Sequence, residues 1–311
     1  MSPRPLSVDP LWPRSGDWPS PDELESGERI DLTLLGIPTF RTSLSATGAG
    51  ETPAAVRAAL RYYAPFLSPD RSAPGPRPPE LEDLLFADAG DVLDPDGPEG
   101  EGRAIAAMAD AVERASVTVA VGGDNALTVP AALGSWGDDL ETAGLVTLDA
   151  HHDLRDGVSN GSPVRRLIEA GLDGRRVVQI GIADFANSHA YAARAEEYGI
   201  TIIHRDELHR RPMDDVMAEA LEIAGSAGGP VHVDLDVDVC DRSVAPGCPA
   251  SIPGGLAAWE LRAAARLAGS WESVRSVDIA EVDATADAPD GRTVRLAALL
   301  VLEVAAGLAS R

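Results

Sequence analysis

Short apolar runs alternate with longer amphipathic segments along most of this chain. Apolar runs between turn residues are typical of buried strands, whereas apolar residues that recur with the helical period predict helices. The predicted strands cover residues 30–36, 84–87, 117–121, 145–149, 177–182, 200–203, 231–237 and 276–279. The predicted helices cover residues 52–60, 103–115, 127–134, 164–171, 188–198, 213–225, 257–268 and 293–309. Strands that alternate with helices form a parallel sheet, which helices cover on both faces.

One domain accounts for most of the chain. Residues 30–311 show no break in composition, and a hydrophobic content of 44% is enough for one large core. Residues 1–29 are rich in Pro, Ser, Asp and Glu and predict an irregular arm, which Trp12 and Trp18 would pack against the domain. The last predicted helix is apolar on all sides, so we expect it either in the core or in a subunit contact.

The charge of the chain excludes several functions. With 26 basic and 50 acidic residues, the net charge is −24, which disfavours nucleic acid and anionic membranes as partners. All the basic residues are arginine, so Schiff-base chemistry and a P-loop lysine are excluded. No segment resembles a signal peptide or is apolar enough to span a bilayer. Two cysteines, Cys240 and Cys248, make no disulfide framework, so we expect a cytoplasmic protein with buried thiols.

Four predicted strands end in side chains that can bind a metal, at residues 122–125, 149–153, 234–241 and 278–281. The carboxyl ends of parallel strands share one edge of a sheet, so these groups should converge. Asp149, His151 and Asp153 alternate, and they would point the same way if the strand stayed extended through them. One acidic strand end is easily a solvated loop, but four at one edge would repel one another without a cation. Oxygen and imidazole ligands suit Mn²⁺ or Zn²⁺.

These four stretches resemble the motifs of the ureohydrolases, a family that includes arginase, agmatinase and formimidoylglutamase. The matching motifs are G-G-D at Gly122–Asp124, D-A-H-x-D at Asp149–Asp153, D-x-D-x-x-D at Asp236–Asp241 and D-I-x-E at Asp278–Glu281. The resemblance runs from about residue 31 to about residue 305. It implies a three-layer α/β/α sandwich with a mostly parallel, eight-stranded sheet, and a homo-oligomer, commonly a trimer or hexamer. It also implies two Mn²⁺ ions that share a bridging water or hydroxide.

The resemblance implies six metal ligands, which are Asn125, Asp149, His151, Asp153, Asp236 and Asp238. Asp149 and Asp236 would bridge both ions, His151 and Asp238 would complete the second site, and Asp153 would belong to the first. Asn125 stands where the family usually has histidine, and an amide oxygen is a weaker ligand than imidazole. We therefore expect the first site to be weak.

Two residues beside the predicted ligands have a different interpretation. Asp234 alternates with Asp236 and Asp238, but only the later pair keeps the family spacing, so we expect Asp234 to lie outside the ligand set. His152 would point to the face opposite His151, and we expect a structural role for it.

The segments Asp153–Arg155, Asn160–Pro163 and Gly181–Ser188 resemble formimidoylglutamase rather than arginase. Arg155 would bind a substrate carboxylate, with an ion pair to Asp156 or to a neighbouring residue as the alternative. Arg165 and Arg166 are further candidates for a second carboxylate, or they are solvated. The resemblance also implies substrate contacts from Asn160, Asn187 and Glu281, with Glu281 holding the amidinium. Asp153 would transfer a proton during the reaction.

The sequence therefore predicts a metal-dependent hydrolase that converts the acidic substrate N-formimino-L-glutamate to L-glutamate and formamide. One alternative is hydrolysis of another guanidino compound, such as guanidinobutyrate, agmatine or arginine. A second alternative, which rests on Asn125, is a catalytically impaired regulatory or scaffolding homologue.

Overall fold

The computed structural model describes residues 6–25, 27–68 and 80–311. At its centre lies an eight-stranded sheet with the order β2-β1-β3-β8-β7-β4-β5-β6. The strands are β1 (Ile30–Ile37), β2 (Phe86–Asp91), β3 (Ala115–Gly122), β4 (Gly144–Leu148), β5 (Val177–Ile182), β6 (Thr201–His204), β7 (Val231–Asp236) and β8 (Val274–Ala280). Every pair of neighbouring strands is parallel, which confirms the predicted sheet.

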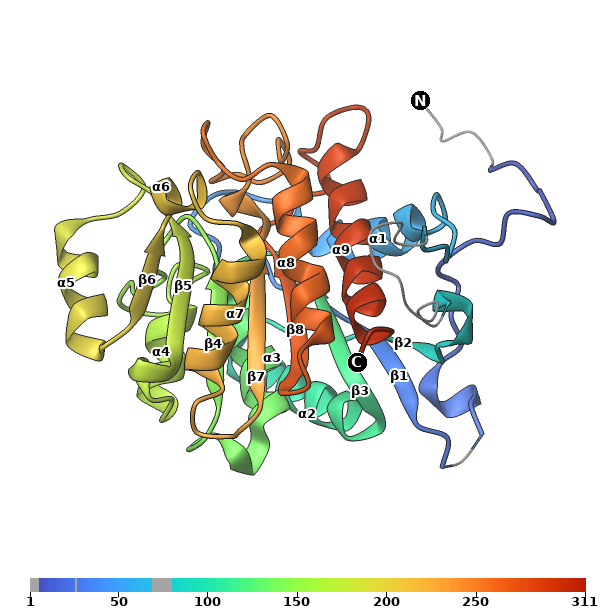
Figure 1. Ribbon diagram of the computed structural model, residues 1–311, viewed down its shortest axis with the longest axis horizontal. Helices are drawn as coiled ribbons and strands as arrows, with labels where there is room; N and C mark the ends of the chain where they lie inside the picture. The colour runs from blue at the N-terminus through green and yellow to red at the C-terminus, as the bar shows by residue number, and fades with distance from the viewer. Residues whose placement is uncertain (1–5, 26, 69–79) are drawn as a thin grey trace.

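Helices cover both faces of this sheet (Figure 1). They are α1 (Thr52–Leu60), α2 (Gly97–Arg114), α3 (Thr128–Trp136), α4 (Pro163–Ala170), α5 (His189–Tyr198), α6 (Arg205–Leu208), α7 (Met213–Ala224), α8 (Ala258–Ser270) and α9 (Arg292–Leu308). In Figure 1, α7, α8 and α9 lie in front of the sheet and α2, α3 and α4 lie behind it. The predicted three-layer sandwich is therefore confirmed.

Burial explains which elements the sequence pattern located well. Every residue of β4 and β7 is buried, as expected for strands covered on both faces. α9 is buried along most of its length, so it belongs to the core, the first of the two predicted places. The edge strand β2 runs to Asp91, beyond the predicted 84–87. Its last residues are polar or exposed, so they do not form the apolar run that predicts a buried strand. α2 begins at Gly97, earlier than predicted, with a proline in its first turn.

The N-terminal arm is only partly packed. The Trp18 ring stacks on the Phe86 ring, with 4.7 Å between centroids, whereas Trp12 is 52% exposed. Residues 1–5 and 26 of the predicted arm lie outside the described residues. Within the described ranges, no helix combines the length and apolar character needed to cross a membrane.

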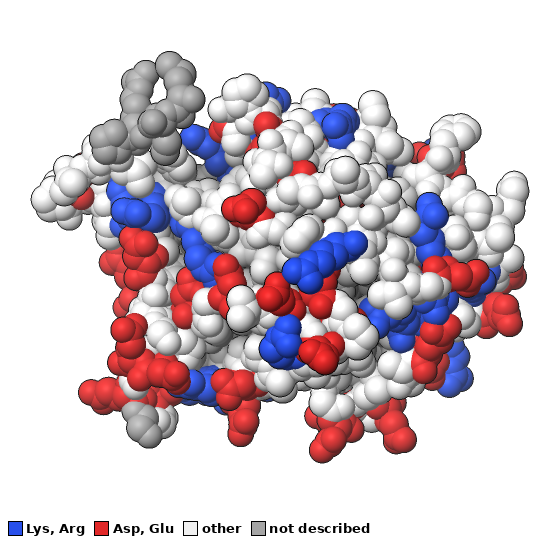
Figure 2. All heavy atoms as spheres, turned by 180° about the vertical axis from the view of Figure 1, so that it is seen from behind, with Lys and Arg blue, Asp and Glu red and all other residues white. Residues whose placement is uncertain are grey.

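Charged side chains cover much of the surface. Figure 2 shows one face, on which acidic side chains line the lower rim and arginines are interspersed among them. On that face the arginines are not gathered into one extended basic patch.

The sheet order brings the four acidic strand ends together. β3, β8, β7 and β4 are consecutive neighbours in the sheet, and these are the strands that precede the four metal-binding stretches predicted from the sequence. β4 and β7 pair with Leu148 opposite Leu235, so Asp149 and Asp236 leave the sheet side by side. The carboxyl edge at this position is where ligands bind in parallel α/β sheets.

Candidate active site and metal centre

The end of β4 turns sharply rather than continuing as a strand. β4 stops at Leu148, and the backbone N–H of His151 donates to Asp149 Oδ1 at 2.7 Å. Asp153 then adopts a left-handed conformation, with φ of 52°. The strand therefore does not stay extended through Asp153, and the condition for alternation is not met. The turn, and not strand alternation, aims these side chains at one point.

The end of β7 uses the same local device. Asp236 is the last residue of the strand, and its Oδ1 accepts the backbone N–H of Asp238 at 2.8 Å. A short 3₁₀ helix, Val237–Val239, follows. Aspartates favour such turns because the short side chain can bond to the backbone two residues on. At both strand ends the first aspartate bonds to the backbone of the second ligand candidate, which sets the spacing of the D-x-H and D-x-D motifs.

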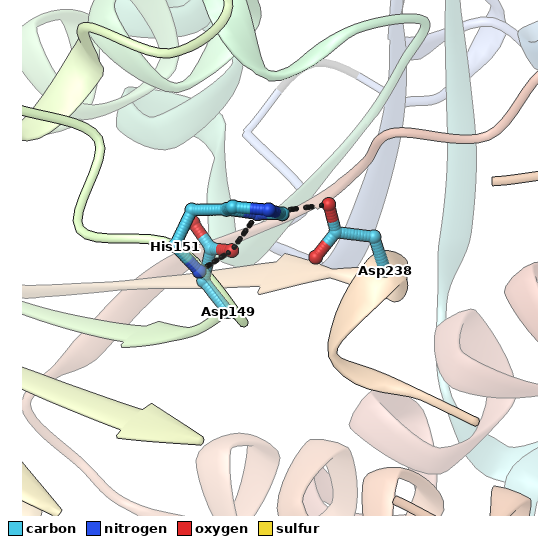
Figure 3. Close-up of side chains that lie close together, drawn as sticks. All are labelled: Asp149, His151 and Asp238. Carbon is cyan, nitrogen blue, oxygen red and sulfur yellow. Dashed lines mark hydrogen bonds and ion pairs between the residues drawn. The ribbon is translucent and has the colours of Figure 1, made fainter. Parts of the chain in front are cut away.

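Two groups of three side chains bring their ligand atoms within 4.8 Å of one another. One group is Asp149, His151 and Asp238, and the other is Asp149, Asp153 and Asp236. Figure 3 shows the first group, in which the imidazole lies between the two carboxylates. His151 Nδ1 is 3.3 Å from Asp149 Oδ1 and 3.2 Å from Asp238 Oδ2. Five of the six predicted ligands therefore converge.

The electrostatics of these groups favour a cation. Burial, reinforced by the charge of Asp238, raises the pKa of Asp149 to about 6, and burial also raises the pKa values of Asp153 and Asp236. Burial alone would lower the pKa of His151, but Asp238 and Asp149 outweigh it and raise it to about 12.

The donor set fits a metal for a second reason. Asp238 Oδ1 is buried and has no hydrogen-bond partner among the described residues. A buried carboxylate oxygen is costly unless it is paired or coordinates a metal. Carboxylates combined with one imidazole suit a divalent ion such as Mn²⁺, so these residues fit the metal implied by the sequence.

Asn125 is placed differently from the other five. Its Oδ1 accepts from Thr128 Oγ1 at 2.6 Å, and its Nδ2 donates to Asp153 Oδ2 at 2.7 Å. The orientation of the amide follows from these two bonds. Asn125 thus turns its donor, and not its oxygen, toward the carboxylates. Its predicted role as a ligand stays a prediction.

Glu281 lies over this cluster in a left-handed conformation, with φ of 59°. Its Oε1 accepts two bonds, from the backbone N–H of Asn125 at 2.9 Å and from Asn160 Nδ2 at 2.6 Å. Its Oε2 has no hydrogen-bond partner among the described residues. Burial, followed by the charge of Asp238, raises the pKa of Glu281 to about 8. One oxygen is therefore anchored, and the other is left for a ligand.

A cavity of about 240 Å³ contains both the cluster and Glu281. Its lining includes Ser43, Ser45, Thr47, Asp124, His151, Asp153, Arg155, Asn160, Asn187, Tyr191, Asp236, Asp238, Glu281 and Asp283. Arg155 is the one arginine among the described lining residues. Its guanidinium forms no ion pair or hydrogen bond with a described residue. Asp156 pairs with Arg194 instead, at 2.8 Å, so the predicted alternative of an Arg155–Asp156 ion pair is wrong.

The other two candidate arginines point elsewhere. Arg165 is buried and donates to the carbonyl oxygens of Arg155 and Gly157 and to Glu169, so it braces the turn before α4. Arg166 forms a two-point ion pair with Glu101, at 2.9 and 2.8 Å. The interpretation of either as a binding site for a second carboxylate is therefore wrong. Both are structural.

Three polar residues near the cluster are engaged in the protein's own bonds. His152 is buried, and its Nδ1 is 2.8 Å from Gln179 Oε1, which agrees with the structural role expected for it. Asn187 accepts the backbone N–H of His152 at 3.0 Å and donates to the carbonyl of Ala150 at 2.9 Å. Asn187 lines the cavity, but its substrate contact stays a prediction. Asp234 belongs to neither ligand group, in line with its predicted place outside the set.

Cys240 and Cys248 are free and buried. Burial raises the pKa of the Cys240 thiol to about 12 and also raises that of Cys248. Both therefore behave as buried thiols, as expected.

Sequence reasoning missed how one loop closes over the cavity. Ser43 Oγ donates to Asp124 Oδ2 at 2.6 Å, and Gly48 N donates to Asp283 Oδ2 at 2.8 Å. Asn160 Oδ1 accepts the backbone N–H of Leu44 at 3.0 Å, so Asn160 joins this loop to Glu281. A Cβ at Gly123 would lie 2.1 Å from the carbonyl oxygen of Thr39, where the same loop crosses the strand end. The Gly/Ser/Thr-rich composition of the loop was the available signal.

Comparisons with known proteins agree with this geometry. The family model described as "Arginase family" matches residues 30–307. The formimidoylglutamase of Halalkalibacterium halodurans is 32% identical over 291 residues, which are 90% of this chain and 88% of the relative. The crystal structure of formimidoylglutamase from Bacillus subtilis has a TM-score of 0.86 and 27% identity, and the match covers 99% of this chain and 96% of that one. The structure of Trypanosoma cruzi formiminoglutamase with Mn²⁺₂ shares the fold, with a TM-score of 0.81, 23% identity and coverage of 95% and 100%. This chain belongs to the arginase family.

Proposed function

We propose that this protein hydrolyses N-formimino-L-glutamate to L-glutamate and formamide. The observation that carries the proposal is one cavity that contains both the buried carboxylates of the metal-binding cluster and Arg155, the one arginine among its described lining residues. A buried carboxylate at Glu281 suits an amidinium, and an arginine suits a carboxylate. Agmatine has no carboxylate for Arg155, and arginine has one carboxylate with a cationic ammonium beside it, so both suit this arrangement less well. The relatives named formimidoylglutamase support the same substrate.

We propose Mn²⁺ as the cofactor. The residues that would hold it are Asp149, His151, Asp153, Asp236 and Asp238. When bound, the metal supplies a nucleophile at neutral pH by lowering the pKa of water. The Mn²⁺ of the Trypanosoma cruzi formiminoglutamase, a protein of the same fold, supports this choice.

The protein's own groups bind the substrate and move the proton. Glu281 Oε2 accepts hydrogen bonds from the amidinium, while Oε1 stays fixed by Asn125 and Asn160. Asp153 takes a proton from the attacking water and passes it to the leaving nitrogen of glutamate. The water oxygen first bonds to the formimino carbon, and the bond from that carbon to the newly protonated nitrogen then breaks. Formamide and glutamate are the balanced products.

The two metal positions should be unequal. Asn125 offers its N–H₂ to Asp153 in place of a nitrogen ligand to the first metal. Asp149, Asp153 and Asp236 keep the charge of that site, so binding should be weakened rather than abolished. The retained acidic set argues against a catalytically impaired homologue.

The partners of the protein remain proposals. We expect a homo-oligomer, a trimer or hexamer, in the cytoplasm, with neither nucleic acid nor membrane as a partner. The excess of acidic side chains supports the exclusion of anionic partners. Sedimentation of the purified protein would measure the assembly.

A substrate panel with added Mn²⁺ tests the proposed function. Formamide is measured with N-formimino-L-glutamate, and urea is measured with guanidinobutyrate, guanidinopropionate, agmatine and arginine. We expect the highest kcat/KM for N-formimino-L-glutamate. A higher value for any guanidino compound would make the substrate assignment wrong, and no activity on any member would support the impaired homologue.

A further inference from the structure

The cavity offers few free donors for a substrate with two carboxylates. Among the described lining residues, Arg155 is the one arginine, and the hydroxyls of Ser43 and Thr47 donate to Asp124 and Asp283. Asn160 and Asn187 are committed to other protein groups. Two lining hydroxyls have no hydrogen bond to a described residue, those of Ser45 and Tyr191.

Tyr191 lines the same cavity as Arg155, and its ring lies near another arginine. Arg194 lies one helical turn after Tyr191 on α5, and its guanidinium carbon is 5.9 Å from the centroid of the Tyr191 ring. The same guanidinium donates to the carbonyl oxygen of Leu154 at 2.6 Å and to Asp156 Oδ1 at 2.8 Å. These two partners are the residues on either side of Arg155. Arg194 therefore links α5, which carries Tyr191, to the backbone on both sides of Arg155.

The position of the Arg155 side chain depends on the absence of a side chain at Gly161. A Cβ at Gly161 would lie 2.7 Å from Arg155 Cδ and 3.1 Å from its Nε, so the arginine side chain crosses the bare backbone of Gly161. The backbone N–H of Arg155 donates to the Gly161 carbonyl at 2.9 Å. Arg155 is exposed, in contrast to the buried carboxylates and Glu281, so it lies on the solvent side of the cavity.

We infer that Tyr191 and Arg155 form a subsite for the side-chain carboxylate of the substrate, and that Tyr191 selects dicarboxylic over monocarboxylic formimino acids. With the amidinium on buried Glu281, the group farthest from the cleaved bond reaches the exposed side, where these two donors lie. The phenol donates to one carboxylate oxygen and the guanidinium to the other. The neighbouring Arg194 adds positive potential and limits the freedom of the ring.

This inference rests on the proposed function, and it explains how the side-chain carboxylate of the substrate would be recognised. It is tested by comparing the Tyr191→Phe variant with the wild type on two substrates, N-formimino-L-glutamate and N-formimino-L-2-aminobutyrate, which lacks the side-chain carboxylate. Loss of a hydrogen bond to a charged group should raise KM for the first substrate roughly tenfold or more. We expect kcat to change little, and both constants for the second substrate to stay unchanged.

Two further variants make the result specific. Tyr198→Phe removes a hydroxyl from the same helix, outside the cavity lining, and should match the wild type on both substrates. Ser45→Ala removes the other free hydroxyl. An equal loss by Tyr191→Phe on both substrates, no loss on either, or a larger selective loss in Ser45→Ala would overturn the inference. A wild type inactive on both formimino acids would instead overturn the proposed function, and the inference with it.

Discussion

Two sites in this molecule bury acidic side chains, and they differ in how the negative charge is balanced. On α9, Glu303 is 6% exposed, and each of its oxygens pairs with its own arginine. Arg262 contacts Oε1 and Arg266 contacts Oε2, each with a closest distance of 2.6 Å. At the carboxyl edge of the sheet, Asp236 and Asp238 are buried at least as deeply, at 2% and 1%, without any arginine partner among the described residues.

The difference shows which acidic cluster is structural and which is functional. Burying a carboxylate is costly unless an opposite charge accompanies it. The chain carries its own counter-charge for Glu303, from arginines on α8. At the sheet edge, four carboxylates have one histidine, His151, as their nearby basic group. Their negative charge is therefore only partly balanced by the protein, and a cation from solution can balance the rest.

The largest effect should come from removing one of the two carboxylates predicted to bridge both metals, Asp236 and Asp149. Asp236→Ala should lose metal and reduce kcat/KM by more than roughly 100-fold, because even groups that only support metal ligands contribute about 10- to 100-fold. Asp149→Ala should behave in the same way. The measurement is formamide release with excess Mn²⁺. Turnover like that of the wild type in either variant would show that these carboxylates do not form the site.

The next effect concerns the one unpaired arginine of the cavity. Arg155→Ala removes a charge-assisted hydrogen bond, which contributes about 1.5–3 kcal/mol. We expect KM for N-formimino-L-glutamate to rise by roughly 10- to 100-fold, with a smaller change in kcat. Steady-state kinetics measures both constants. An unchanged KM would mean that the substrate carboxylate lies elsewhere.

A matched change at the structural site should have the opposite signature. Glu303→Gln leaves Arg262 and Arg266 facing a neutral amide, which should lower the melting temperature by a few degrees. Metal content and kinetic constants should stay those of the wild type, because Glu303 lines no part of the cavity. Thermal unfolding and the same activity assay are compared side by side. A kinetic defect in the folded variant would show that Glu303 also affects the active site, against this prediction.

The smallest effect is a change in metal affinity at Asn125. After dialysis, the wild-type protein should carry fewer than two Mn²⁺ ions per chain, and its activity should rise with added Mn²⁺. Asn125→His replaces an amide with an imidazole and should reduce that dependence. Metal analysis of both proteins measures the difference. Two ions at full occupancy in the wild type would show that Asn125 does not weaken the first site.

The sequence predicted the strands, the layers and the meeting of four acidic ends, because apolar periodicity and parallel topology determine these features. It did not predict the sharp turn that places Asp153, since a left-handed φ at an aspartate leaves no periodic signal. The link from Leu44 through Asn160 to Glu281 was also missed, because it joins residues more than a hundred positions apart. Arg165 was misread for a different reason. Its partners depend on how the turn before α4 folds.

Calorimetric titration of Mn²⁺ into metal-free protein tests whether the acidic edge of the sheet is a metal site. Metal ligands must be deprotonated, and the pKa values of Asp149 and His151 are raised to about 6 and about 12, so at pH 7 binding should release protons. Because these shifts are upward, affinity should increase with pH. Titrations at pH 6 and pH 8, in buffers of different ionisation enthalpy, measure both quantities. We expect Mn²⁺ binding with net proton release, stronger at pH 8 and lost in Asp236→Ala. Absence of binding in the wild type, or equal binding by the variant, would contradict it.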